Sequence, residues 1–332
     1  MPNTAASGTV HVAAGLLLQD GRVFITRRPT NTHQGGKWEF PGGKLLSGET
    51  ALAALKRELH EELGVEVEEA VPYMQVRHRY LDKEVLLDVW RVTAYRGAPH
   101  GREGQGARWA APSDLVALEF PAADLPVLRR LWLPPLYLIS DAARIGKQKF
   151  FALLESALNA GARLIHLREP QMDESEFRAY ASEVIALCRR HGARILLNAS
   201  PELAVALGAD GVHLKSARLM RLTERPLGNE FWVAASCHDA DELKRAADVG
   251  ADFAMLGPVA HTASHPGAAP LGWEKFENLC RGAALPVYAL GGMRAVDLPR
   301  ARAAGAQGVA MIRGVWDAVD PADVVKKINR QD

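Results

Sequence analysis

The sequence predicts an α+β domain over residues 1–132, followed by an α/β barrel over residues 136–332. A chain of 332 residues is too long for one ordinary domain and suits two. Leu133-Pro134-Pro135 ends a helical pattern and marks the boundary, because proline cannot continue a helix. Beyond it, the hydrophobic pattern changes to a regular alternation of helical segments and short apolar runs.

Hairpin, helix and strand patterns make up the first domain. Its opening apolar segments flank a turn at Asp20-Gly21, which predicts a hairpin. Residues 50–63 contain no Gly or Pro and are rich in helix formers, so they predict a helix. The remaining elements are strand patterns at 71–80 and 85–95 around a turn at Asp82-Lys83, and a helical pattern at 125–132.

A Gly-Ala pair recurs before apolar runs in the second domain. The glycine closes a helix, and the run that follows predicts a buried parallel strand. Eight such βα units in about 200 residues predict a TIM barrel, with a doubly wound open sheet as the alternative. The eight runs are LYLIS from Leu136, RLIHLRE from Arg163, RILLNA from Arg194, DGVHLK from Asp210, WVAASCH from Trp232, DFAMLG from Asp252, PVYALGG from Pro286 and QGVAMI from Gln307.

Composition narrows the class of protein. A net charge of +1 without a basic run argues against a binder of nucleic-acid polymers and suits a small anionic substrate. Cys188, Cys237 and Cys280 lack metal-like spacing, so we expect reduced thiols in a cytoplasmic protein. The first 21 residues suggest a strand pair rather than a signal peptide, and no run is long enough for a membrane span. The sequence does not determine the oligomeric state, and a homo-oligomer is one of the alternatives.

Residues 43–65 carry the most specific motif, with the spacing G-x5-E-x7-R-E-U-x-E-E-x-G-U, where U is aliphatic. On the predicted helix Glu58, Glu61 and Glu62 share one face. Carboxylates this close repel each other unless a cation lies among them, and oxygen ligands suit Mg²⁺ or Mn²⁺. The alternative is a solvated acidic face. An opposite, apolar stripe would anchor the helix through Leu52, Leu55, Leu59 and Leu63.

Two neighbouring features suit the same site. Arg57 can pair with Glu49 or Glu58 and hold the carboxylates in place. Gly42-Gly43 lets the backbone come close to a ligand.

The motif resembles the Nudix box at every specified position. Segments at 25–28 (ITRR), 38–44 (WEFPGGK), 101–109 (GREGQGARW) and 120–128 (FPAADLPVL) are also similar to MutT enzymes, which remove 8-oxo-dGTP from the nucleotide pool. The resemblance implies a Nudix fold and metal-dependent hydrolysis of oxidised purine nucleoside triphosphates to the monophosphate and pyrophosphate. It also implies a role in mutation avoidance.

Site residues follow from this resemblance, position by position. It implies metal binding by Glu58, Glu61, Glu62 and Glu103 with the carbonyl of Gly42, and catalytic roles for Glu58, Glu61, Arg57 and Glu103. Either Glu58 or Glu103 would be the general base. Arg28 matches a nucleotide contact, Phe40 an aromatic against the base, and Tyr80 stands where the family has Phe.

Asp124 departs from the MutT pattern, which has Asn. An amide can donate to O6 of 8-oxoguanine and accept from N7–H, whereas a carboxylate only accepts. Asp124 could regain a donor if an apolar pocket kept it protonated, or it could accept from N1–H and the 2-amino group of a turned base. The structural alternative is a cap for the helix that begins at Leu125.

The barrel strands are similar to those of thiamine-phosphate synthase and its relative TenI, a thiazole tautomerase. The similarity is carried by HLRE, GADGVHL, GPVAHTASH, ALGGM and GVAMIRG. It implies that a phosphorylated ligand is held at Gly291-Gly292 and at Ile312-Arg313, unless the glycines serve only a tight turn. His238 matches the TenI histidine that shuttles a proton, although such a histidine can also be structural.

The residues of the synthase site are largely replaced. Where that family has Gln and Lys around its Arg, this chain has His166 and Pro170 around Arg168. Losing the magnesium carboxylates removes the charge stabilisation that a leaving pyrophosphate requires. Further replacements are Asn198-Ala199 for Asn-Asp, Lys215-Ser216-Ala217-Arg218 for Gly-Gln followed by an acid, and His265 for Lys.

Three functions remain open. The first is a Nudix hydrolase for oxidised purine nucleoside triphosphates, with a degenerate barrel of binding or regulatory role. The second is a thiamine-pathway protein in which the Nudix domain trims a thiamine-related pyrophosphate beside a TenI-like barrel. In the third, the barrel is a non-enzymatic ligand sensor or dimerisation scaffold.

Overall fold

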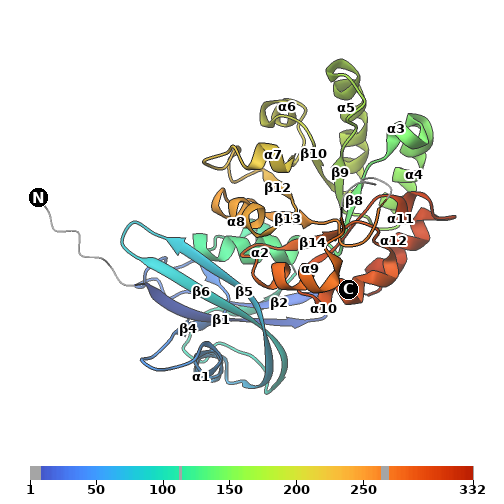
Figure 1. The fold of residues 1–332 in the computed structure, drawn as a ribbon. Helices are drawn as coiled ribbons and strands as arrows, with labels where there is room; N and C mark the ends of the chain where they lie inside the picture. The colour runs from blue at the N-terminus through green and yellow to red at the C-terminus, as the bar shows by residue number, and fades with distance from the viewer. Residues whose placement is uncertain (1–8, 112–113, 263–268, 332) are drawn as a thin grey trace, which may run out of the picture. The chain divides into compact units, whose positions relative to one another are not determined.

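The computed structural model describes residues 9–111, 114–262 and 269–331, and it divides the chain into two compact units, Met1–Trp132 and Leu133–Asp332 (Figure 1). The α+β class of the first unit and the barrel class of the second are both confirmed. Among the described residues, no helix is both long and apolar enough to cross a membrane.

A mixed sheet organises the first unit, in the order β3-β2-β1-β6-β5, with β4 paired to β1 and β7 paired to β2. The predicted hairpin is β1 with β2. The parallel pairing of β1 with β6, which places Val10 beside Val85, was not predicted. The strands are β1 (Val10–Gln19), β2 (Arg22–Arg27), β3 (Trp38–Glu39), β4 (Gly42–Lys44), β5 (Glu66–Arg79), β6 (Glu84–Arg96) and β7 (Ala107–Ala110).

Helix α1 (Ala51–Leu63) begins after Thr50, whose side chain accepts a hydrogen bond from the Ala53 amide at 3.2 Å. It ends at Gly64, which adopts a left-handed φ of 70°. The predicted apolar stripe is buried except for Leu52, which is half-buried, and Ala54 is buried as well. This stripe fixes the acidic face of α1 on the opposite side. Shorter elements follow later: η1 (Asp114–Ala117), η2 (Ala122–Asp124) and α2 (Leu125–Trp132).

The second unit is a closed barrel of parallel strands in the order β10-β11-β12-β13-β14-β15-β8-β9 (Figure 1). Closure excludes the open-sheet alternative. Its strands are β8 (Leu136–Ile139), β9 (Leu164–Leu167), β10 (Arg194–Leu197), β11 (Gly211–Leu214), β12 (Trp232–Cys237), β13 (Phe253–Leu256), β14 (Val287–Leu290) and β15 (Gly308–Met311).

The described helices follow the strands in sequence and pack around the barrel. They are α3 (Ala142–Ile145), α4 (Lys147–Asn159), α5 (Glu174–Arg190), α6 (Pro201–Ala206), α7 (Ser216–Leu219), α8 (Ala240–Asp248), α9 (Gly272–Arg281), η3 (Ala295–Asp297), α10 (Leu298–Ala303), α11 (Arg313–Trp316) and α12 (Pro321–Asn329).

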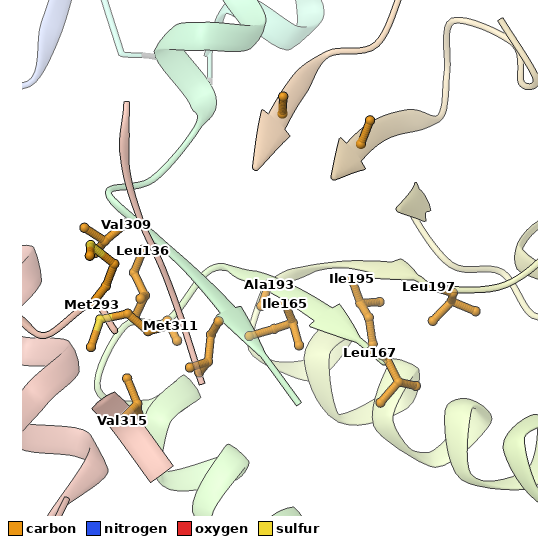
Figure 2. Packing of buried hydrophobic residues seen from close by; sticks show 14 of the residues in the cluster. Leu136, Ile165, Leu167, Ala193, Ile195, Leu197, Met293, Val309, Met311 and Val315 are labelled. Carbon is orange, nitrogen blue, oxygen red and sulfur yellow. The ribbon is translucent and has the colours of Figure 1, made fainter. Parts of the chain in front are cut away.

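Alternate residues of the strands form the core between strands and helices. Ile165 and Leu167 of β9 and Ile195 and Leu197 of β10 belong to one buried cluster (Figure 2). The glycine of each predicted Gly-Ala pair has a positive φ, between 62° and 102°, as a helix-closing glycine requires. The Gly-Ala pairs therefore precede the strands because their glycines end the preceding helices.

Candidate active site

Arg57 of α1 is the centre of a carboxylate network. Its Nε and Nη2 donate to Glu49 at 3.0 and 2.9 Å, and its Nη1 donates to Glu58 Oε1 at 2.7 Å. A further bond reaches the Lys44 carbonyl at 3.1 Å, and a weaker one reaches Glu61 at 3.4 Å. From the sequence, Arg57 could pair with Glu49 or with Glu58, and in the structure it binds both. These bonds raise the pKa of the Arg57 guanidinium and lower the pKa of the Glu49 carboxyl.

The two glycines after β3 make room for the carboxylates of α1. A side chain at Gly43 would place its Cβ 2.2 Å from Glu58 Cδ, so only glycine lets the backbone lie against this carboxylate. Gly42 has a φ of 146°, and its N–H donates to Glu62 Oε2 at 3.1 Å. Strand β4 and the acidic face of α1 are therefore in direct contact.

The surroundings of Glu62 carry an excess of negative charge. Burial raises its pKa to about 8, and repulsion from Glu39, Glu58 and Glu103 adds to the effect, against the Gly42 hydrogen bond. Burial likewise raises the pKa of Glu39 to about 7, although Arg28 opposes the shift. A cation among these groups would relieve the repulsion.

The possible ligands suit a hard divalent ion, since they are several carboxylate oxygens beside the backbone of Gly42-Gly43. Across the described residues, however, no three His, Cys, Asp or Glu side chains already converge as a metal cluster. Glu61 is the most open of the three helix carboxylates described, with 54 % of its side chain exposed. Metal binding by Glu58, Glu61 and Glu62 therefore remains a proposal.

The loop that carries Glu103 is anchored on the end of α1. The Arg102 amide and the Gln105 side chain both donate to the Glu62 carbonyl, at 2.9 and 3.2 Å. The amide of Glu103 donates to Gln105 Oε1 at 2.7 Å. The exposed Glu103 is close enough for its charge to raise the pKa of Glu62. The structure thus brings Glu103 near the helix carboxylates.

The residues expected to recognise the base form a second group. Arg28 is ion-paired with Glu39, and its Nε donates to the His33 carbonyl at 3.0 Å. The Tyr80 hydroxyl accepts from the Ala123 amide at 3.2 Å, directly before Asp124. Asp124 is only 6 % exposed, and its burial, with a smaller contribution from Glu39, raises its pKa well above the usual range.

Phe40 belongs to the hydrophobic core. It is 3 % exposed and packs against Phe120 with ring centroids 5.8 Å apart. Packing in the core accounts for this position, and little of the Phe40 surface remains for contact with a base.

Glu39 and Gln105 were not predicted as site residues. Glu39 connects the two parts of the site, because it pairs with Arg28 and raises the pKa of both Asp124 and Glu62. In the sequence, Glu39 could have been noticed from its position between Trp38 and Phe40, shortly before Gly42-Gly43.

In the barrel, a cavity of about 550 Å³ is lined by residues at and after the carboxyl ends of the strands. All of the predicted barrel residues line it: His238, Gly291, Gly292, Ile312 and Arg313. A cavity at this end of a TIM barrel is where such folds bind ligands.

His238 is held by an acid that the sequence did not identify. Its Nδ1 lies 2.8 Å from Glu242 Oε2, and its amide donates to the same oxygen at 2.7 Å. The Ser216 hydroxyl donates to the other oxygen of Glu242. This arrangement orients the imidazole, as a role in proton transfer would need.

Backbone conformation and close packing explain why glycines occupy positions 291 and 292. Their φ angles are 103° and 69°, and a Cβ on Gly291 would lie 2.6 Å from Pro258 Cβ. Close packing therefore accounts for Gly291-Gly292 without a phosphate.

Some of the residues at positions of the synthase pattern lie at the same cavity. His166, Arg168, Asn198 and Lys215 line it. Arg218 donates to the Ala199 carbonyl at 3.4 Å, Pro170 is exposed, and His265 lies outside the described residues.

Comparison with known proteins matches both units. Residues 136–315 match the family model for thiamine monophosphate synthase, and residues 13–130 match the model for the NUDIX domain. A thiamine-phosphate synthase of Chromobacterium violaceum is 38 % identical over 184 residues, which cover 54 % of this chain and 87 % of that protein.

Two solved structures are similar as well. A thiamine phosphate pyrophosphorylase from Pyrococcus furiosus has a TM-score of 0.50 at 23 % identity, over 59 % of this chain and 93 % of its own, which shows the fold. A structure from a study of MutT from Aliivibrio salmonicida and Vibrio cholerae is 38 % identical, over 37 % of this chain and 97 % of its own, with a TM-score of 0.33.

Proposed function

Because the chain belongs to the thiamine monophosphate synthase family through residues 136–315 and carries a Nudix domain over residues 13–130, we propose a function for each unit. The Nudix domain acts as a pyrophosphohydrolase on oxidised purine nucleoside triphosphates such as 8-oxo-dGTP, releasing the monophosphate and pyrophosphate. The barrel has a binding or regulatory role. The observation that carries the proposal is the Arg57 network, which holds Glu49 and Glu58 beside strand β4, where a Cβ on Gly43 would meet the Glu58 carboxylate.

The residues of the acidic site divide the work of hydrolysis in this proposal. Glu58, Glu61 and Glu62 would hold Mg²⁺ or Mn²⁺, with Glu103 and the Gly42 backbone beside them. When bound, the divalent ion neutralises triphosphate charge and lowers the pKa of a water molecule. Arg57 positions Glu58 through the 2.7 Å bond, and Glu58 or Glu103 accepts the proton of the attacking water.

The base site supplies the selectivity. Arg28, fixed by Glu39, would contact the nucleotide, and Tyr80 stands beside Asp124 through its bond to Ala123. Burial of Asp124 supports the protonated form, which can donate to O6 of 8-oxoguanine.

Product release from several substrates tests this function. Full-length protein with Mg²⁺ should release pyrophosphate from 8-oxo-dGTP at a higher kcat/KM than from dGTP or dATP. Comparable rates on all three would contradict selectivity for oxidised purines, and no release from any of them would contradict the function.

Glu61→Gln provides the matched variant. The substitution is nearly isosteric and Glu61 is exposed, so the fold should be kept. Turnover should fall by about a hundredfold or more, the size of effect seen when one electrostatic group is removed from an active site. Turnover close to that of the wild type at saturating Mg²⁺ would remove Glu61 from the metal site.

A thiamine-pathway function is the second candidate, and the barrel cavity favours it. The relative from Chromobacterium violaceum is named a thiamine-phosphate synthase, and His238 is held in an oriented position by Glu242. In this case the Nudix domain would trim a thiamine-related pyrophosphate. Phosphate release from thiamine pyrophosphate, assayed beside the nucleotides, decides between the two candidates.

A further inference from the structure

The loop that carries Glu103 has the sequence GREGQG over residues 101–106. Three of its six residues are glycine. Gly104 adopts a left-handed φ of 76°, and a Cβ there would meet nothing within 4 Å. A chain of this kind has many accessible conformations unless other groups hold it. Glu103 is the only acidic residue of the loop, so the groups that hold the loop also set the place of this carboxylate.

Hydrogen bonds from two backbone amides hold the first part of the loop on the end of α1. The Arg102 amide donates to the Glu62 carbonyl at 2.9 Å, and the His100 amide donates to the Leu63 carbonyl at 3.3 Å. These bonds end at Arg102, one residue before Glu103.

The side chain of Gln105 holds the second part of the loop. Its Oε1 accepts from the Glu103 amide at 2.7 Å, and its Nε2 donates to the Glu62 carbonyl at 3.2 Å. Gly101 leaves room for this contact, because a Cβ there would lie 2.3 Å from the Gln105 carbonyl oxygen and 3.2 Å from its Oε1. This pair of hydrogen bonds, the Gln105 clamp, joins the backbone of Glu103 to the last turn of the helix that carries Glu62.

The clamp requires a donor and an acceptor on one side chain. A carboxylate at position 105 would accept from the Glu103 amide but would face the Glu62 carbonyl with a second oxygen, and an apolar side chain would make neither bond. The two partners also fix the orientation of the Gln105 amide, because an N–H must face its oxygen and a carbonyl must face its nitrogen.

The carboxylate of Glu103 depends on its backbone for its position. Among the described residues, no hydrogen bond or ion pair holds this exposed carboxylate itself. It is nevertheless close to the acidic face of α1, since its charge contributes to raising the pKa of Glu62.

We propose that Gln105 is a positioning residue for Glu103: by joining the Glu103 amide to the Glu62 carbonyl, it sets the distance between the Glu103 carboxylate and the carboxylates of α1. The inference rests on the function proposed for the Nudix domain, in which Glu103 lies beside Glu58, Glu61 and Glu62 at the metal site. Gln105 needs no contact with substrate or ion in this role. Its effect should therefore pass through Glu103 alone.

Amide hydrogen exchange tests the clamp directly. Gln105→Met keeps the length of the side chain but removes its donor and acceptor. In full-length protein followed by NMR, exchange of the Glu103 amide should become about fivefold faster or more, the worth of one hydrogen bond. The Arg102 amide keeps its own hydrogen bond and should stay as protected as in wild type. Gln75→Met, which removes a glutamine hydrogen bond to Asp88 elsewhere in the Nudix unit, is the control and should change neither amide.

Mn²⁺ binding tests whether the clamp acts through Glu103. Electron paramagnetic resonance measures the bound ion, and the ion bound at α1 is the one lost in Glu61→Gln. Gln105→Met should weaken its binding by about tenfold, as the loss of a supporting group does, and by no more than Glu103→Gln does. In a double-mutant cycle, Gln105→Met should have no further effect once Glu103→Gln is present.

Steady-state kinetics separate this role from substrate binding. With 8-oxo-dGTP, Gln105→Met should lower kcat by about tenfold and leave KM within about twofold, because the residues expected to contact the base are untouched. If wild type released no pyrophosphate, the proposed function would fall, while the exchange and Mn²⁺ results would still decide the role of Gln105.

Several results would overturn the proposal. Unchanged exchange of the Glu103 amide in Gln105→Met, or an equal increase in Gln75→Met, would refute the clamp. An equal increase at Arg102 would show a general loosening of the loop. If Gln105→Met weakened Mn²⁺ binding equally with and without Glu103→Gln, the effect would not pass through Glu103. Mn²⁺ binding unchanged in Glu103→Gln would remove the carboxylate that Gln105 is proposed to position.

Discussion

At the scale of single residues, Asp124 shows what burial does to a carboxylate. No backbone N–H of α2 within the described chain donates to its side chain, so the helix-cap explanation gains no support from hydrogen bonding. Its burial favours the uncharged form, and the negative charge of Glu39 acts in the same direction, against Arg28. A protonated Asp124 offers the donor that an Asn would offer.

The pH dependence of selectivity tests this protonation. If Asp124 donates to O6, the kcat/KM ratio of 8-oxo-dGTP to dGTP should fall as pH rises through its raised pKa. Asp124→Asn should remove this dependence and keep the selectivity. If Asp124 instead accepts from N1–H and the 2-amino group, the variant should weaken all guanine substrates alike, by about 1–3 kcal/mol. An unchanged ratio in both proteins would exclude Asp124 from base recognition.

The effect of Asp124→Asn on stability should depend on pH. Since the folded-state pKa of Asp124 lies above the unfolded value of about 4, folding favours the protonated form. Asp124 therefore contributes stability that wild type loses as pH rises from about 4 through the folded pKa, and Asp124→Asn lacks this contribution. The difference in Tm, variant minus wild type, should grow over this range in thermal unfolding experiments. A difference that stays flat with pH would contradict the raised pKa.

At the scale of elements, the site depends on how closely strand β4 approaches α1. The two glycines of β4 face different neighbours. A Cβ on Gly43 would meet the end of the flexible Glu58 side chain, whereas a Cβ on Gly42 would lie 2.1 Å from the backbone oxygen of Ala13. The φ of 146° at Gly42 also disfavours any side chain.

Alanine at each glycine should therefore have a different effect. Gly43→Ala should lower kcat by about tenfold or more, because Glu58 must move, while Tm changes little. Gly42→Ala should cost about 1–3 kcal/mol in the free energy of unfolding. Thermal unfolding and steady-state kinetics on both variants check this. Equal loss of stability in the two would show that Gly43 serves packing rather than the carboxylate.

At the scale of the whole molecule, two units with separate hydrophobic cores carry different chemistry. The Nudix unit concentrates negative charge on α1, while basic side chains line the barrel cavity. The net charge of +1 is a sum over the whole chain and therefore reveals neither local concentration of charge.

The barrel should not make thiamine phosphate. Ala199 and Lys215 replace residues of the synthase pattern, Lys215 lines the cavity, and the carboxylates that would hold magnesium are absent from the described lining. Pro170 and His265 are further replacements in the sequence. Purified protein given the pyrimidine pyrophosphate and thiazole phosphate should yield no thiamine phosphate, with a known synthase as the positive control. Product at ordinary enzymatic rates would show that other residues have taken over the chemistry.

Local patterns in the sequence were sufficient for the elements and for much of the candidate site. The 3.6-residue period places Glu58, Glu61 and Glu62 on one face of α1, and the Gly-Ala pairs mark strand starts, because both depend only on near neighbours in the chain. Tertiary structure decided the rest: the parallel pairing of β1 with β6, the burial of Asp124, the link from Glu39 to Glu62, and the Gln105 clamp that joins Glu103 to Glu62. Burial, pKa and hydrogen-bond partners depend on groups distant in sequence, which only folding brings together.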